Sequence, residues 1–208
     1  AYEKVVLLPL YPHFSVSTTG SSFNEWKREF KGDTSKLVYV NEYFDNETYA
    51  RAINQRIDEA LLKFPEAVRS EVQLVFSAHG TPVSYVKKGD PYSHQIKKTV
   101  NLIMKLRNNS HEYRECFQSK VGPVKWLEPA TDTMIEELAK DGKKHLLLIP
   151  ISFVSDHVET LFELGIEYKH VADKSGIENY IVMEGLNDSK LFVEALCQEV
   201  NKSLNGNK

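Results

Sequence analysis

The chain has 208 residues, of which 41% are hydrophobic, a formal net charge of -3 and two cysteines. This length suffices for one or two domains with apolar cores. The charge balance excludes a general nucleic-acid binder. Two distant cysteines exclude a zinc finger or a disulfide framework and favour a reducing compartment. Apolar runs are far shorter than the about 18 residues of a membrane span, and no signal peptide is expected because residues 1–4 lead straight into a strand-like run.

Apolar runs of strand length alternate along the chain with segments of helical periodicity. Ser22 is expected to cap the first helix, and Pro129 to lie in the first turn of a later one. This alternation predicts an α/β fold with a parallel sheet covered on both faces. The expected strands cover residues 5–10, 37–40, 72–77, 113–119 and 180–183, with one more starting at residue 146. The expected helices cover 23–30, 46–63, 91–106, 129–140 and 189–204, with an acidic helix after residue 157. Residues 15–22 are expected to form a polar loop.

Two of the expected strands lead into a histidine. His79 directly follows an apolar run and precedes Gly80 and Pro82, which stop the strand. His157 follows the strand that starts at residue 146. Ligands of open α/β sheets bind beyond the carboxyl ends of the strands, so the two histidines are predicted to share one cleft. A purely structural role remains the alternative for each.

Glutamates are spaced regularly after the second histidine. Glu159, Glu163 and Glu167 stand at i, i+4 and i+8 and would line one face of a helix. Like charges at this spacing repel each other. A path for a divalent cation or for protons would justify them, and a solvated acidic surface is the alternative.

Five sequence blocks, in order, resemble the ferrochelatases, which insert ferrous iron into protoporphyrin IX in the last step of haem synthesis. Their order and spacing over nearly the whole chain are more specific than any single block. The resemblance implies a chelatase-like, Rossmann-type three-layer α/β sandwich with parallel sheets, in two similar domains of which the first is incomplete. The blocks are residues 10–12 with 17–22, 76–80, 89–92, 118–123 with 126–127, and 155–161.

The resemblance also implies roles for individual residues. The family's cleft histidine corresponds to His79, and the glutamate across the cleft corresponds to Glu159. Which of the two binds metal and which takes the pyrrole protons stays open. Asp156 and His157 are expected to support them as further catalytic residues. The expected metal set is His79, Glu159, Glu163 and Glu167, and Tyr92 and Trp126 are expected near the porphyrin, with turn and core positions as their alternatives.

Family members carry about a hundred further N-terminal residues, including a porphyrin-binding lip. We therefore expect residues 1–40 to be the remainder of an N-terminal domain and residues 41–188 to form the C-terminal domain with the catalytic residues. Residues 189–208 are expected to form a helix that packs back on the first domain. This truncated chain could be inactive alone.

The expected enzyme is a lyase with Fe(II) as substrate metal and protoporphyrin IX as the porphyrin, a choice that the block at 118–127 supports. No iron–sulfur cluster is expected, because two distant cysteines cannot supply four ligands. We expect no nucleic-acid partner, at most peripheral membrane contact, and a monomer or homodimer. The expected location is the bacterial cytoplasm, or the organelle matrix or stroma in a eukaryote. The alternatives are a related chelatase for coproporphyrin or sirohydrochlorin, and a non-catalytic metal- or haem-binding fragment.

Overall fold

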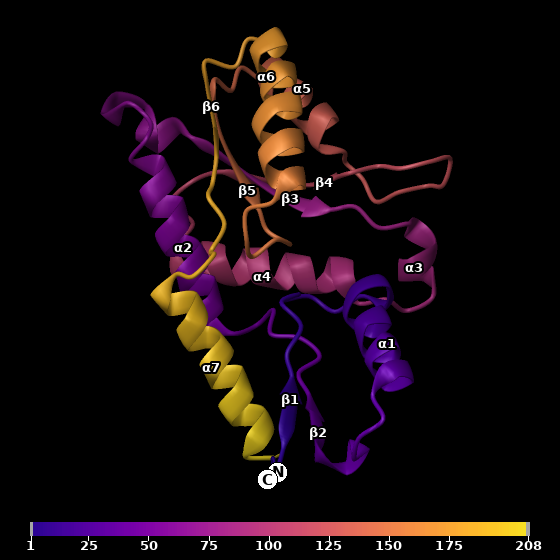
Figure 1. Ribbon diagram of the computed structural model, residues 1–208. Helices are drawn as coiled ribbons and strands as arrows, with labels where there is room; N and C mark the ends of the chain where they lie inside the picture. Colours follow the sequence, from indigo (N-terminus) through magenta and orange to yellow (C-terminus); the bar gives the residue numbers. More distant parts are fainter. Residues whose placement is uncertain (1, 207–208) are drawn as a thin grey trace.

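The computed structural model describes residues 2–206 and contains two parallel sheets (Figure 1). Two short strands form the first sheet, and four strands form the second in the order β4-β3-β5-β6. All of the pairs are parallel. The strands are β1 (Val5–Leu7), β2 (Leu37–Tyr39), β3 (Gln73–His79), β4 (Tyr113–Gln118), β5 (His145–Pro150) and β6 (Asn179–Val182).

Helices of three types connect these strands. The α-helices are α1 (Ser21–Glu29), α2 (Glu47–Leu61), α3 (Val83–Lys87), α4 (Tyr92–Leu106), α5 (Thr131–Lys140), α6 (Tyr168–Ser175) and α7 (Lys190–Leu204). Two segments are π-helical, η1 (Val16–Gly20) and η4 (Glu159–Glu167), and two are short 3₁₀ turns, η2 (Thr34–Lys36) and η3 (Glu66–Glu71). None of the helices within residues 2–206 has the length and apolar character needed to cross a bilayer.

The four-stranded sheet is the middle layer of a three-layer sandwich. Successive side chains of a strand point to opposite faces. On β3, Leu74 and Phe76 accordingly join the core made with α2 and α4, whereas Val75 joins the core made with α5 and α6. On β5, Leu147 and Leu148 divide in the same way. The predicted α/β fold with helices on both faces is therefore confirmed, and the two central strands are mostly apolar because both of their faces are covered.

The last helix connects the two sheets. α7 lies along α2 and also contacts β1 and β2, and the Lys4 ammonium donates a hydrogen bond to the Leu204 carbonyl. Lys4, just before β1, and Leu204, at the end of α7, consequently lie side by side. The small sheet thus packs against the larger unit through α7 and through the loop that follows β1.

Three local expectations are wrong. The first strand ends at Leu7 instead of residue 10, because Pro9 has no N–H for the ladder and Leu10 is exposed. Ser22 does not cap α1, which begins one residue earlier and runs on from η1; Ser15 caps η1 through its hydroxyl. Pro129 precedes α5, since its carbonyl accepts the Phe117 N–H and so extends the edge of β4.

The acidic segment is helical, as expected, but its hydrogen bonding is unusual. Residues Glu159–Glu167 form the π-helix η4, and α-helical geometry begins only at Tyr168. The expected polar loop at 15–22 likewise contains η1. π-Helical turns are rare and occur often at functional sites.

Candidate active site

His79, the last residue of β3, is fixed through its backbone. Its N–H donates to the Ser152 hydroxyl at 2.8 Å, and its carbonyl accepts the Tyr92 hydroxyl at 3.0 Å. Ser152 follows the end of β5, so the carboxyl ends of the two central strands meet here. Burial raises the pKa of Tyr92 well above its ordinary value, which keeps the phenol protonated as a donor.

The hydrogen bonds of the His79 ring determine its tautomer. Nδ1 lies 2.8 Å from the Gly80 carbonyl oxygen, which can only accept. The neutral ring therefore carries its proton on Nδ1, and Nε2 has a free lone pair. Nε2 faces the Glu159 carboxylate at 3.9 Å, and the two side chains are 39% and 50% exposed. A ligand can therefore reach both His79 and Glu159, and Nε2 of His79 can accept a proton or a hydrogen bond.

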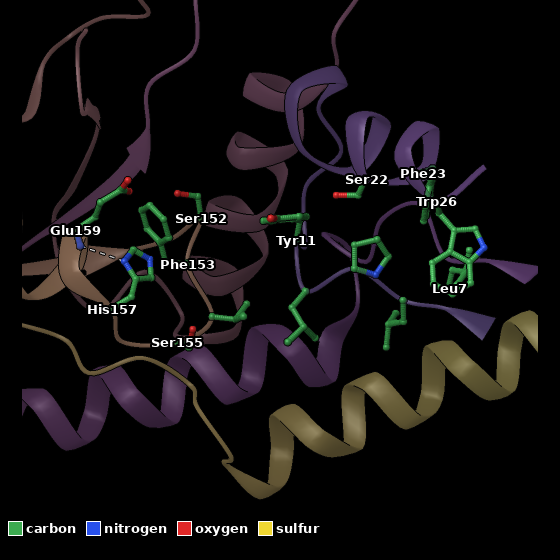
Figure 2. A pocket seen from close by; sticks show the side chains of 14 residues that line it. Leu7, Tyr11, Ser22, Phe23, Trp26, Ser152, Phe153, Ser155, His157 and Glu159 are labelled. Atoms are coloured by element: carbon green, nitrogen blue, oxygen red, sulfur yellow. Dashed lines mark hydrogen bonds between the residues drawn. The ribbon is translucent and has the colours of Figure 1, made fainter. Parts of the chain in front are cut away.

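His157 lies on the other side of Phe153. The Phe153 ring makes edge-to-face contacts with both histidines, with centroids 4.5 Å from His157 and 6.0 Å from His79. Figure 2 shows His157 next to Phe153, with its hydrogen bond to Glu159 drawn as a dashed line. There the Glu159 N–H donates to Nδ1 of His157 at 3.1 Å, so His157 carries its proton on Nε2. The two histidines are thus opposite tautomers, and His157 orders the first turn of η4.

Both oxygens of the Asp156 carboxylate make structural contacts. Oδ1 accepts the Gly185 N–H at 2.9 Å, and Oδ2 accepts the Asn187 amide at 2.8 Å. The Asn187 side chain in turn accepts the Asp156 N–H at 3.0 Å. Asp156 therefore fastens the turn before η4 to the connection between β6 and α7.

The regularly spaced glutamates have different surroundings. Glu163 accepts the Ser119 N–H and the Tyr168 hydroxyl at Oε1, each at 2.8 Å, and the Ser119 hydroxyl and Gln118 amide at Oε2. Burial and this carboxylate raise the pKa of Tyr168. Glu167 is exposed. Within residues 2–206, no three His, Cys, Asp or Glu side chains come close enough to form a metal cluster. The structure thus brings Glu159 to His79 and leaves Glu163 and Glu167 apart from them.

Two cavities meet at this site. The first, of about 590 Å³, lies between the β1–α1 region and residues 152–159 (Figure 2). The second, of about 450 Å³, lies between residues 11–18 and the end of β3, and Tyr92 and Trp126 are among its lining residues. Both cavities share Tyr11, Ser152, Phe153 and Glu159. The two residues expected near a porphyrin therefore line the cavity that contains His79.

Three residues of the site were missed in the sequence. Ser152 and Phe153 contact His79, and Ser119 holds Glu163. Each of them follows closely on the end of a strand of the four-stranded sheet, and the end of a strand is the position that singled out His79 itself. The same rule, applied to β4 and β5, would have found them.

A family model described as ferrochelatase matches residues 1–204. The chain belongs to the ferrochelatase family. It is 46% identical over 201 residues to the ferrochelatase of Citrifermentans bemidjiense, covering 95% of this chain and 62% of that protein. It is 47% identical to the ferrochelatase of Geotalea uraniireducens, covering 97% and 63%. With the ferrochelatase of Synechocystis the identity is 42%, covering 98% and 53%. This ferrochelatase-family chain thus spans 53–63% of the length of these relatives.

Solved structures show that the fold is chelatase-like. SirB from Bacillus subtilis with Fe3+ superimposes with a TM-score of 0.66 at 15% identity, covering 98% of this chain and 72% of SirB. DR2241 from Deinococcus radiodurans, a multi-domain protein similar to chelatases, gives a TM-score of 0.61 at 14% identity, covering 95% and 41%. At these identities the likeness concerns the fold alone.

Proposed function

We propose that this chain carries the metal-insertion centre of a ferrochelatase, with Fe(II) and protoporphyrin IX as substrates and protohaem as product. The observation that carries the proposal is the pair of His79 Nε2 and Glu159, 3.9 Å apart, at the opening of the two cavities. Membership of the family supports the reaction class.

His79 acts as the proton acceptor in this proposal. Metal insertion requires the two pyrrole N–H protons to leave the macrocycle. Imidazole is the side chain best suited to accept a proton near neutral pH. The Gly80 carbonyl holds the tautomer in which Nε2 is free to do so. The Glu159 carboxylate then stabilises the imidazolium that forms.

Glu159 also supplies an oxygen that an incoming divalent ion accepts. Carboxylate and imidazole are both ligands for Fe(II), which must shed water as it enters the ring. The Glu159 side chain is half exposed, so a hydrated ion can reach it. Asp156 and His157 hold the turn that presents Glu159 and do not meet the substrate in this scheme.

The lining of the cavities favours protoporphyrin IX. Tetrapyrroles with more carboxylates, such as coproporphyrin or sirohydrochlorin, call for additional cationic side chains. Neither cavity has an arginine or a lysine among the residues 2–206 that line it. Aromatic side chains, among them Tyr11, Phe153 and Trp126, contribute to the walls instead and suit a flat apolar macrocycle.

The test is an anaerobic assay of the Soret band of protoporphyrin IX with Fe(II) or Zn(II). We expect His79→Ala and Glu159→Gln each to slow insertion by at least about 100-fold, the usual contribution of a general acid or base. The exposed residues His94 and Glu137 provide matched controls. His94→Ala and Glu137→Gln should stay within about twofold of the unmodified chain.

Near-normal insertion by both site variants would refute the assignment. Porphyrin binding without insertion would favour the non-catalytic alternative for this chain, which spans at most 63% of the relatives described above. In that case the same four variants should be compared in a protein of the relatives' length.

A further inference from the structure

The loop after β1 is joined to α4 and its preceding turn by a buried series of polar contacts. Three side chains, Asp90, Gln95 and Thr99, contact consecutive residues of the segment 13–16. The order is antiparallel, with Thr99 at the start of the segment and Asp90 at its end. We call these contacts the polar seam.

The hydrogen bonds of the polar seam are short and directional. His13 Nε2 lies 2.9 Å from the Thr99 hydroxyl, which itself donates to the Phe44 carbonyl, so His13 is the donor. The Phe14 N–H donates to the side-chain amide oxygen of Gln95 at 2.7 Å. Asp90 Oδ2 accepts the Ser15 hydroxyl at 2.9 Å and the Val16 N–H at 2.8 Å.

The side chains of the polar seam are almost fully buried. The five side chains His13, Ser15, Asp90, Gln95 and Thr99 are at most 8% exposed. Burial lowers the pKa of His13 to about 3, so the imidazole stays neutral at physiological pH. Breaking any one contact would strand a buried donor, which costs far more than an exposed hydrogen bond is worth. The position of the loop on α4 is therefore strongly determined.

The polar seam continues to the proton acceptor. Asp90 Oδ1 accepts the Tyr92 N–H at 3.0 Å, and the Tyr92 hydroxyl donates to the His79 carbonyl at 3.0 Å. A connected path thus runs from Val16 through Asp90 and Tyr92 to His79. Residues of the segment 11–18 line the 450 Å³ cavity together with His79, whereas Asp90, Gln95 and Thr99 do not line it.

We propose that Asp90, Gln95 and Thr99 are positioning residues that set the distance between the wall at 11–18 and His79, and thereby the affinity for the porphyrin. The part about affinity rests on the proposed function. The three residues act through the wall and do not contact the macrocycle. Their substitution should therefore weaken porphyrin binding and leave the rate of metal insertion into bound porphyrin unchanged.

Two variants test the polar seam. Asp90→Asn replaces a carboxylate that accepts three hydrogen bonds by an amide, which must turn an NH₂ group toward at least one of the same donors. Thr99→Val removes one hydroxyl at nearly constant shape and guards against misfolding of the first variant. The controls are Asp141→Asn, at an exposed position, and Ile103→Val, which weakens the core beneath α4 without touching the polar seam.

Two readouts separate the polar seam from the proposed function. Amide hydrogen exchange reports on the Val16 N–H, whose partner is the Asp90 carboxylate, with Leu74 in β3 as internal reference. Titration with protoporphyrin IX gives the dissociation constant, and the Zn(II) assay at saturating porphyrin gives the insertion rate. We expect Asp90→Asn to raise the dissociation constant by about tenfold, with the saturated rate within about twofold.

In both seam variants the segment 13–16 should lose protection while Leu74 keeps it. The proposal is overturned if Val16 protection and porphyrin affinity in Asp90→Asn equal those of the unmodified chain, or if Ile103→Val weakens porphyrin binding equally. If the unmodified chain binds no porphyrin, the proposed function fails for this chain. Hydrogen exchange then decides the polar seam alone, since unchanged protection refutes it and selective loss at 13–16 supports it.

Discussion

The two π-helical segments border the same site but are held in different ways. η1 contains only uncharged residues, and the carboxylate of Asp90, 74 positions away from Val16, holds its first residue. η4 carries its own anchor in Glu163, and Asp156 fastens the turn before it. The anchoring carboxylate of η1 therefore belongs to a distant residue, whereas that of η4 belongs to a residue of η4 itself.

This difference determines what each segment can present to the cavities. π-Helical hydrogen bonding is poorly favoured, so side-chain contacts must help to hold such a segment in place. On η4 these contacts lie before and after Glu159, whose carboxylate is left to face His79. On η1 the contact lies at its first residue, Val16, and the segment contributes to the wall of the 450 Å³ cavity. The position of the anchors therefore decides which segment offers a reactive group.

Removing the internal anchor of η4 should have the largest effect on stability. Glu163→Ala leaves the Ser119 N–H and the hydroxyls of Ser119 and Tyr168 without their acceptor. We expect the free energy of unfolding to fall by about 2 kcal/mol, measured by urea denaturation at pH 7. Glu167→Ala, on the same segment but exposed, should stay within about 0.5 kcal/mol. Equal losses in the two variants would contradict the anchoring role.

Removing the anchor before η4 should have a smaller effect. Asp156→Ala abolishes the contacts to Gly185 and Asn187, but water can replace part of them because the residue is exposed. A loss of about 1.5 kcal/mol is expected in the same denaturation experiment. Hydrogen exchange should increase at Gly185, while Val16 in η1 stays unchanged. An equal increase at Val16 would show that the two segments are not held independently.

Acid should destabilise the folded chain through His13, which precedes η1. The pKa of His13 is lowered by burial from 6.5 to about 3, so below pH 6.5 the unfolded chain binds a proton that the folded chain does not. Stability from this group is complete above pH 6.5 and falls as the pH drops toward 3. Between pH 7 and 5.5 the loss should be about 1 kcal/mol.

The variant His13→Gln isolates this effect, because glutamine can still donate to Thr99 and does not titrate. We expect its stability to fall by about 1 kcal/mol less than that of the unmodified chain over the same pH interval. Chemical denaturation at the two pH values measures the difference. Parallel pH dependences would show that His13 is protonated in the folded state.

Much of the architecture could be predicted from the sequence, because its signals are local. Continuous apolar runs mark strands buried on both faces, and helical periodicity marks the layers between them. The position of His79 at the end of such a run placed it at the edge where ligands bind. The local expectations failed at Ser22, because the helical segment already begins at Val16, whose N–H is held by Asp90, and at Pro129, whose carbonyl is held by β4.

The sequence by itself determined the order of the elements, the parallel sheet and the family. Only the tertiary structure decided what each ionisable group does. Glu159 and Glu163 stand four residues apart on η4, yet Glu159 faces His79 at the end of β3, whereas Glu163 accepts hydrogen bonds from Ser119, which follows β4. The tautomers of His79 and His157, by contrast, follow from local contacts with the Gly80 carbonyl and the Glu159 N–H. A side chain's chemistry depends on contacts a few ångströms away, and the fold brings most of these from distant parts of the chain.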